Sequence, residues 1–178
     1  MLTFDTQRHL DAHTQTWLVH LFESAFPHEE RRRTTQLLDL IESGKTTCHT
    51  AYYDGKCTAF LTEWNLGDFR YGEYFAVDAD MRGQNIGSAT MQHVLSLSQQ
   101  PFVLEVELPD TDIARRRIAF YERIGFVLCE KHYLQPPYNE GFPAVPLRLM
   151  EYGGQLTQTD FDQVAHTLHR VVYNQTNV

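Results

Sequence analysis

The sequence has little cysteine and no long apolar run. Its three cysteines, Cys48, Cys57 and Cys129, have no metal-binding spacing, and their odd number leaves at least one thiol unpaired. Reduced thiols are typical of cytoplasmic proteins. No uninterrupted apolar stretch approaches the ~20 residues of a membrane span, and Asp5 and Arg8 precede any apolar run, so no signal peptide is visible. We therefore expect a cytoplasmic protein without a membrane partner.

Positive charge is also scarce. The chain has 15 Lys and Arg residues against 23 Asp and Glu residues, a net charge of −8. This balance argues against binding to nucleic acid or to an anionic membrane, and it favours a cationic acceptor such as an amine. With 178 residues, 42% of them hydrophobic and 21% charged, the composition is that of one globular domain covering residues 1–178.

The distribution of apolar residues predicts a mixed α/β (α+β) domain. Apolar residues recur at helical spacing in three segments, and β-rich runs lie between the helices. Asp54-Gly55 is a strong signal for a two-residue hairpin turn, and Gly44 is expected to end a helix. The predicted helices are Leu10–Ala25, Glu29–Ser43 and a C-terminal one after Gly153-Gly154; the predicted strands include Thr47–Tyr53, Lys56–Asn65, Tyr71–Asp78 and Val145–Tyr152.

One segment, Tyr74–Leu95, combines a buried strand, a short polar loop and an amphipathic helix. Gly83 and Gly87 let backbone amides approach a ligand closely, and Asn85 tolerates left-handed geometry, so we expect a positive φ there. The loop opens onto a helix N-terminus, where unpaired N–H groups and the helix dipole attract anions. The segment therefore predicts a phosphate-binding loop.

A second segment follows at a short distance. The β-rich run Pro101–Glu107 is broken by Pro109-Asp-Thr-Asp112, and Ile113–Gly125 is predicted to be a helix that glycine ends. Phe126 then begins another strand.

Together these segments resemble the GNAT superfamily of N-acetyltransferases. Arg82 and Gly87 fit the outer positions of the family's loop pattern, in which Gln or Arg is followed by two residues, Gly, one residue, and Gly or Ala; Asn85 stands where the family usually has glycine. Phe120-Tyr-Glu-Arg-Ile-Gly-Phe126 resembles the family's Tyr-Glu-Lys-Leu-Gly-Phe segment. The resemblance covers Tyr71–Tyr152 and implies a single GNAT-like domain, with a mixed, twisted sheet, flanking helices and an extra C-terminal helix.

The resemblance also implies acetyl-CoA as cosubstrate. In the family the loop wraps the coenzyme's pyrophosphate, and the backbone N–H of the residue at Val77 polarises the thioester carbonyl. Among Arg115, Arg116 and Arg117, Arg116 is our candidate for a coenzyme phosphate clamp; the alternative is a solvated helix face. The family often has Asn at the position of Ala114. The predicted cofactor-binding residues are Val77, Arg82, Gly83, Gln84, Asn85, Ile86, Gly87, Ser88 and Arg116.

Three catalytic candidates follow from the chemistry and the resemblance. Tyr121 matches the tyrosine that protonates the coenzyme thiolate in many family members; the alternative is core packing. Acetyl transfer needs a neutral amine, so some group must accept a proton. Glu73, Glu105 and Glu107 lie on the two strands expected to flank the site, and we select Glu107 and Glu73 as candidate bases. Either could instead face solvent or pair with an arginine.

The predicted function is transfer of an acetyl group from acetyl-CoA to a primary amine by direct attack in a ternary complex. The acceptor, a small molecule or a peptide, is left open. The alternative is a coenzyme-A-binding sensor or interaction module without catalysis. The off-pattern Asn85 and Ala114 keep this alternative open, and Tyr121 and the strand carboxylates argue against it. The apolar stripe of the C-terminal helix could close the core or join two subunits. No metal is expected, because the pairs His9/His13 and His166/His169 lack a further ligand.

Overall fold

Residues 1–175 form eight strands and six α-helices, which confirms the predicted mixed α/β fold class. The computed structural model describes residues 1–175. These residues form two compact units: the first contains residues 1–64 and 72–98, and the second residues 65–71 and those from 99 onward. The prediction of one domain over residues 1–178 stays a prediction, and residues 176–178 lie outside the described part.

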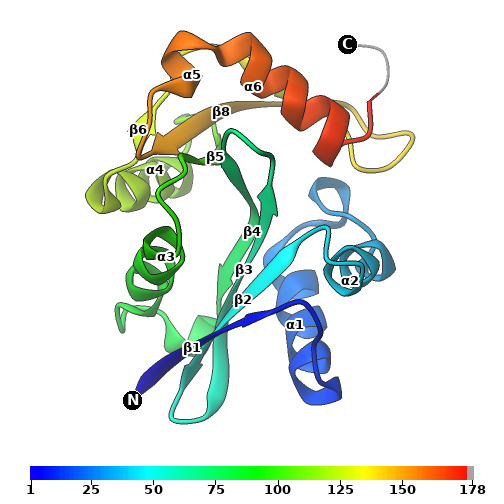
Figure 1. The fold of residues 1–178 in the computed structure, drawn as a ribbon, viewed down its shortest axis with the longest axis vertical. Helices are drawn as coiled ribbons and strands as arrows, with labels where there is room; N and C mark the ends of the chain where they lie inside the picture. The colour runs from blue at the N-terminus through cyan, green and yellow to red at the C-terminus, as the bar shows by residue number, and fades with distance from the viewer. Residues whose placement is uncertain (176–178) are drawn as a thin grey trace. The chain divides into compact units, whose positions relative to one another are not determined.

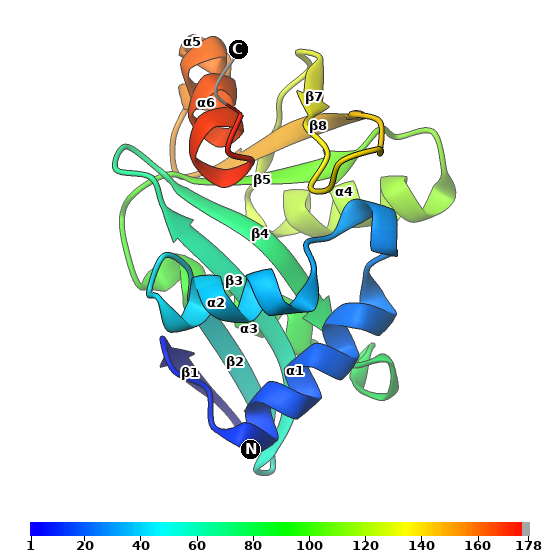
Figure 2. The ribbon, with the colours of Figure 1, turned by 90° about the vertical axis from the view of Figure 1, so that its right-hand side faces the viewer.

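The first unit contains four strands and three longer helices. The strands follow the order β1 (Leu2–Gln7), β2 (Thr47–Tyr53), β3 (Lys56–Asn65) and β4 (Arg70–Val77). The last residue of β3 and the first two residues of β4 are counted in the second unit. Helices α1 (Ala12–Ala25) and α2 (Thr34–Glu42) lie on one face of these strands, and α3 (Ile86–Ser96) lies on the other (Figures 1 and 2). Two short 3₁₀ turns, η1 (His28–Glu30) and η2 (Ala79–Met81), complete it.

The turn and helix-end signals in the sequence of this unit have the predicted structural effects. Asp54 and Gly55 have φ angles of 48° and 77°, which the two-residue hairpin between β2 and β3 requires. Gly44, with φ 71°, ends α2 as predicted. The side chain of Asp11 caps α1 by accepting hydrogen bonds from the backbone N–H groups of His13 and Thr14.

The core of the first unit lies on both faces of its strands. Leu18 and Phe22 of α1 are fully buried, and Trp17 packs edge-on against Phe60 of β3 with ring centroids 6.4 Å apart. On the opposite face, Ile86 of α3 packs against Ala51 and Ala59. A sheet covered on both faces is the reason that the middle of β2 is buried at every position.

The second unit is built around the strand pair β5 (Phe102–Glu107) and β8 (Val145–Tyr152). These strands are antiparallel, from Phe102 opposite Tyr152 to Glu107 opposite Leu147. Two short strands, β6 (Val127–Leu128) and β7 (Tyr133–Gln135), also pair with β8. Helix α4 (Asp112–Ile124) lies on one face of the pair; α5 (Leu156–Thr159), α6 (Phe161–Thr167) and the π-helical turn η3 (Leu168–Val172) lie on the other (Figures 1 and 2).

Two expectations from the sequence are wrong, and one strand was not predicted. The sequence did not predict β1, whose pairing with β2 is long-range (Leu2 opposite Tyr53). The helix predicted from Glu29 begins only at Thr34, because the chain is a 3₁₀ turn at His28–Glu30 and extended at Arg31 and Arg33. The single C-terminal helix is interrupted at Asp160, whose φ and ψ of −128° and 38° are not helical.

The strand Val145–Tyr152 and the helix before Gly125 are confirmed. Among residues 1–175, no helix combines the length and the apolar character that crossing a membrane would require.

Candidate functional site

The predicted phosphate loop lies in the first unit, where β4 ends at Val77. The side chain of Asp78 accepts a hydrogen bond from the backbone N–H of Asp80 (3.1 Å), which starts the turn η2. Arg82, Gly83, Gln84 and Asn85 follow and are all exposed. The loop therefore presents its backbone and the Arg82 side chain to solvent.

Asn85 has φ 62° and ψ 8°, so the predicted positive φ is confirmed. Its carbonyl accepts the first hydrogen bond of α3, from Ala89 N–H (3.0 Å), but its side chain caps none of the helix N–H groups. The N–H groups at the start of α3, from Ile86 to Ser88, thus have no intrahelical acceptor and no side-chain cap from Asn85. Such a helix start suits an anion.

The Val77 side chain packs, partly buried, against Ala51, Ala59 and Ile86. It is an ordinary core residue. Any role for this position in thioester chemistry therefore belongs to its backbone N–H.

Glu73 on β4 is held in an ion pair. Its Oε1 accepts a hydrogen bond from Arg32 Nε (2.7 Å), and its Oε2 accepts one from Trp64 Nε1 (2.7 Å). The Glu73 side chain is 0% exposed and that of Arg32 is 13% exposed. Both carboxylate oxygens are therefore occupied, and the ion pair is shielded from water.

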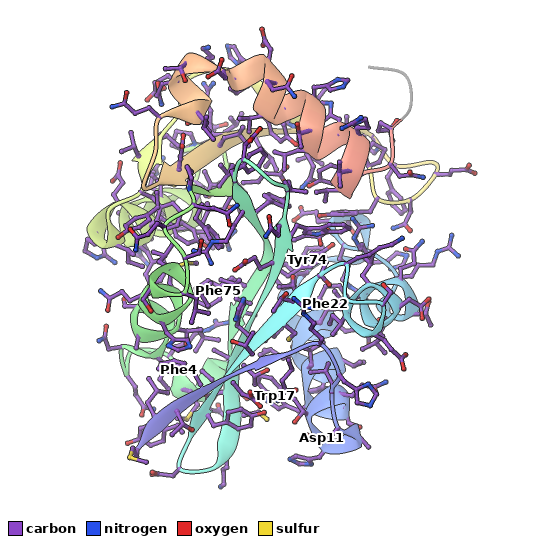
Figure 3. All side chains as sticks on the ribbon, viewed as in Figure 1. Phe4, Asp11, Trp17, Phe22, Tyr74 and Phe75 are labelled. Atoms are coloured by element: carbon purple, nitrogen blue, oxygen red, sulfur yellow. The ribbon has the colours of Figure 1, made fainter. Side chains whose placement is uncertain are left out.

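The neighbouring Tyr74 fixes the segment that carries Arg32. Its hydroxyl accepts a hydrogen bond from the Arg32 backbone N–H (3.0 Å), and its ring lies 4.9 Å from Phe22 and 5.0 Å from Phe26. Figure 3 shows Tyr74 and Phe22 together on the α1 side of β4, with Phe75 on the opposite side. Tyr74 and Glu73 together hold the chain between α1 and α2 in place.

Tyr121 lies in the last turns of α4, in the second unit. Its side chain is packed against Phe120 and Phe126, with ring centroids 5.1 and 5.4 Å away, and the residue is 8% exposed. The hydroxyl makes no hydrogen bond to another residue in the described part of the chain. Burial raises the pKa of Tyr121 to about 12, with Arg117 lowering it and Glu107 raising it. The phenol is therefore neutral near pH 7 and has a proton to donate.

Gly125 fixes the end of α4 behind Tyr121. Its φ is 110°, and the N–H of Phe126 donates to the carbonyl of Tyr121 (3.1 Å). A Cβ at Gly125 would lie 3.2 Å from the Tyr152 ring. Glycine therefore lets the chain turn sharply and bring Phe126 onto Tyr121.

Glu107 and the three consecutive arginines Arg115–Arg117 of α4 form a partly exposed group. Arg117 donates to Glu107, the two side chains being 47% and 43% exposed. Arg115 donates to Asp112 and to the Pro109 carbonyl. Arg116 is exposed and, within the described residues, makes no hydrogen bond or ion pair. Of the three it is therefore the one left to bind a ligand, and Glu107 is a paired carboxylate.

A buried polar network in the second unit was only partly foreseen. Glu105 Oε2 accepts hydrogen bonds from Gln135 Nε2 (2.6 Å) and from the Tyr173 hydroxyl (2.7 Å). The Tyr173 hydroxyl also lies 3.2 Å from that of Tyr71 and 3.3 Å from that of Tyr138. The sequence pointed to Glu105 but not to Tyr173, because 68 residues separate Tyr173 from Glu105 and no local pattern links them.

A sequence model described as the acetyltransferase (GNAT) family matches residues 12–126, more than half of the chain. The chain belongs to this GNAT family. The resemblance inferred from the loop and from the Phe120–Phe126 segment is thereby confirmed. Acetyl transfer is the activity of the family, and no comparison favours the non-catalytic alternative.

Solved structures agree with the GNAT assignment. A protein from Bacteroides thetaiotaomicron, assigned to the GNAT acetyltransferases, is 34% identical, with a TM-score of 0.92 over 98% of this chain and 99% of that one. NAA60 of Arabidopsis thaliana in complex with acetyl-CoA is 16% identical, with a TM-score of 0.64 over 85% and 98% of the two chains.

A third structure is a chimera of the spermidine N-acetyltransferase SpeG from Vibrio cholerae and hSSAT. It is 14% identical, with a TM-score of 0.64 over 84% and 93%. At this level of identity the likeness shows the fold. No curated protein matches the sequence.

Two further observations complete the site of this GNAT protein. Ala114, where the family often has Asn, is 2% exposed and lies on the buried face of α4. In residues 1–175 no group of three or more His, Cys, Asp or Glu side chains is arranged to hold a metal ion.

Proposed function

We propose that this GNAT protein is a cytoplasmic N-acetyltransferase that moves the acetyl group of acetyl-CoA to a primary amine. The amine attacks the thioester directly in a ternary complex. The observation that carries this proposal is the loop before α3. Asn85, whose backbone is left-handed, connects the exposed loop to the start of α3, and its side chain does not cap that helix. An uncapped helix N-terminus of this kind suits a pyrophosphate.

In this proposal residues Arg82–Ser88 hold the pyrophosphate through backbone N–H groups and the Arg82 guanidinium. The Val77 backbone N–H polarises the thioester carbonyl, where charge develops as the amine attacks. Arg116, an exposed arginine in the first half of α4 without a hydrogen bond or ion pair to a described residue, pairs with another coenzyme phosphate. NAA60, a structural neighbour, binds acetyl-CoA, which supports acetyl-CoA as the cosubstrate.

Tyr121 is the proposed general acid. It gives its phenolic proton to the sulfur as the carbon–sulfur bond breaks, and a raised pKa keeps that proton in place at neutral pH. Phe120 and Phe126 hold the ring, so the hydroxyl is positioned before substrate binds. Core packing alone would not require a hydroxyl at this position.

Glu107 and Glu73 are the proposed bases. One of them accepts the proton that the attacking amine loses, directly or through water. Their contacts favour Glu107, since its partly exposed ion pair with Arg117 can open at low cost. Glu73 must give up two hydrogen bonds in a shielded site to act.

Coenzyme binding at the loop is tested by thermal unfolding. Acetyl-CoA should raise the melting temperature of the wild-type protein by mass action, about 2.7 kcal/mol of stabilisation at a hundredfold excess over Kd. Gly87→Val should abolish that shift, because a β-branched side chain blocks the approach of the phosphate to the backbone. Gln92→Val, at an exposed position of the same helix, should keep it. A folded Gly87→Val protein with unchanged affinity for acetyl-CoA would refute the loop assignment.

A further inference from the structure

Phe4 of β1 connects the two ends of α3. Its ring stacks on that of His93 in the last turn of the helix, with ring centroids 4.3 Å apart and an angle of 9° between the planes. The same side chain packs against the buried cluster of Ile86, Ala51 and Ala59, and Ile86 is the first residue of α3. Figure 3 shows Phe4 on the α3 side of β1. One side chain therefore joins His93 to the helix start that is proposed to bind pyrophosphate.

A second, buried histidine acts on His93 through its charge. His49 of β2 is 4% exposed; its Nε2 lies 3.1 Å from Glu63 Oε2, and its Nδ1 lies 3.1 Å from the Thr6 hydroxyl. A proton on the His49 ring is thus neutralised by Glu63. Within residues 1–175, no carboxylate pairs with His93 in the same way: α3 contains none, and Asp5 of β1 is exposed and accepts a hydrogen bond from the Thr6 N–H (2.8 Å). A positive charge on His93 is therefore uncompensated.

The surroundings of His93 favour its neutral form. Burial lowers the pKa of His93, and the charge of His49 lowers it further. Both act against the stabilisation that an aromatic face and a helix C-terminus give to a cation. The stability that a neutral histidine of this kind contributes is present above the unfolded-state value of about 6.5, and it is lost as the pH falls through the folded-state pKa. The packing of α3 on β1 should therefore weaken in acid.

We propose that the stack of His93 on Phe4 is an acid-sensitive latch that regulates coenzyme binding. Neutral His93 holds Phe4 against α3, and Phe4 in turn packs against Ile86 at the helix start. In acid the protonated ring moves into water, Phe4 loses one side of its packing, and the loop Arg82–Ser88 loses the support of an ordered helix start. Affinity for acetyl-CoA then falls. This inference rests on the proposed coenzyme site and adds its regulation.

The first test follows the His93 ring by NMR in the full chain. The pH is varied from about 4.5 to about 8, which spans the titration of an imidazole with a lowered pKa, and the signal is assigned by its loss in His93→Gln. Without coenzyme the pKa of His93 should lie below its ordinary value of about 6.5. Acetyl-CoA should lower it further, because binding selects the neutral form, whereas direct attraction to the coenzyme phosphates would raise it. A pKa at or above the ordinary value, or one that acetyl-CoA raises or leaves unchanged, would overturn the proposal.

The second test measures the Kd of acetyl-CoA by calorimetry over the same pH range. One pH unit below the pKa of His93, about a tenth of the wild-type molecules carry the neutral ring, so the apparent Kd should be about tenfold higher than at neutral pH. A phosphate monoester also titrates near pH 6, at about its second pKa, so the comparison is with His93→Phe, which keeps an aromatic ring and should lack this tenfold change. His20→Phe, at an exposed position of α1, is the matched control and should behave as the wild type. Should His93→Phe not fold, His93→Gln, also neutral at every pH, gives the same comparison.

The two tests separate the latch from the proposed function. The titration without coenzyme reports the pKa of His93 whether or not acetyl-CoA binds. Binding of acetyl-CoA with the same pH dependence in the wild type and in His93→Phe would refute the latch and keep the coenzyme site. No binding of acetyl-CoA at any pH would refute both.

Discussion

Tyr121 shows at the scale of one residue how packing and chemistry combine. Phe120 and Phe126 fix its ring, while its hydroxyl has no partner in the described part of the chain. Burial raises its pKa to about 12, which keeps the proton on the oxygen. The residue is thus rigid and protonated, as a general acid must be.

Tyr121→Phe should lower kcat by roughly 10²–10⁴, the range for loss of a catalytic acid or base. The ring contacts remain, so stability and the KM for acetyl-CoA should change little. The loss belongs in kcat because the interaction forms only as the thiolate develops. Steady-state kinetics with a true acceptor measures it. Normal turnover by Tyr121→Phe would assign this side chain to core packing.

The two candidate bases should respond differently to the same substitution. Glu107→Gln removes a partly exposed ion pair and should cost at most about 1 kcal/mol of unfolding free energy. Glu73→Gln removes the negative charge that pairs with the mostly buried Arg32 and should cost about 3 kcal/mol. Denaturant unfolding measures both changes.

If Glu107 is the base, Glu107→Gln should also lose about 10²-fold or more in kcat, with its fold intact. Glu73→Gln should then keep its turnover when it is compared at the same folded fraction. The opposite kinetic pattern would transfer the role of base to Glu73.

At the scale of an element, the start of α3 depends on one left-handed residue. Asn85 has φ 62°, which Gly adopts freely and a β-branched residue does not. Asn85→Gly should keep the affinity for acetyl-CoA, whereas Asn85→Ile should lose about 1–2 kcal/mol of stability and weaken coenzyme binding. Thermal unfolding with and without acetyl-CoA measures both. Gln92→Ile, at an exposed position of α3 outside the loop, is the control; equal losses in Gln92→Ile and Asn85→Ile would mean that φ is not the cause.

The end of α4 offers a second test at this scale. Gly125 has φ 110°, and a Cβ there would crowd the Tyr152 ring; Gly141 has φ 88° and open space. Both Gly→Ala variants carry the cost of positive φ, about 1–2 kcal/mol. Gly125→Ala should cost more, by about 1 kcal/mol, because it must also displace Tyr152. Equal costs, measured by denaturant unfolding, would show that the ring contact is unimportant.

The sequence could predict those features that depend on residues close together in the chain. The Asp54-Gly55 turn, the stop at Gly44 and the positive φ of Asn85 depend on neighbouring residues, and all three were predicted. Strand β1 has only two apolar residues, Leu2 and Phe4, and it exists because it pairs with β2 far along the chain. A local pattern does not contain that pairing.

The candidate sites divide in the same way. The loop and Tyr121 became candidates because they lie in contiguous motifs. The ion pair of Glu73 with Arg32 joins residues 41 positions apart, and the network of Glu105 with Tyr173 joins a strand to the end of the chain. Both depend on tertiary packing, so the sequence showed the carboxylates without their partners.

At the scale of the whole molecule, the net charge supports the proposed amine acceptor and the family supports acetyl transfer. The net charge of −8 attracts cations, and the GNAT family transfers acetyl groups. The central claim is therefore that acetyl transfer from acetyl-CoA depends on an amine.

Release of free thiol from acetyl-CoA, measured against a panel of primary amines, diamines and peptide N-termini, tests this claim most directly. The account predicts saturable, amine-dependent release that equals the amount of N-acetylated amine, with Tyr121→Phe as the impaired control. Stabilisation of the protein by acetyl-CoA with no amine-dependent thiol release across the panel would contradict it, and would instead indicate a coenzyme-binding protein without catalysis.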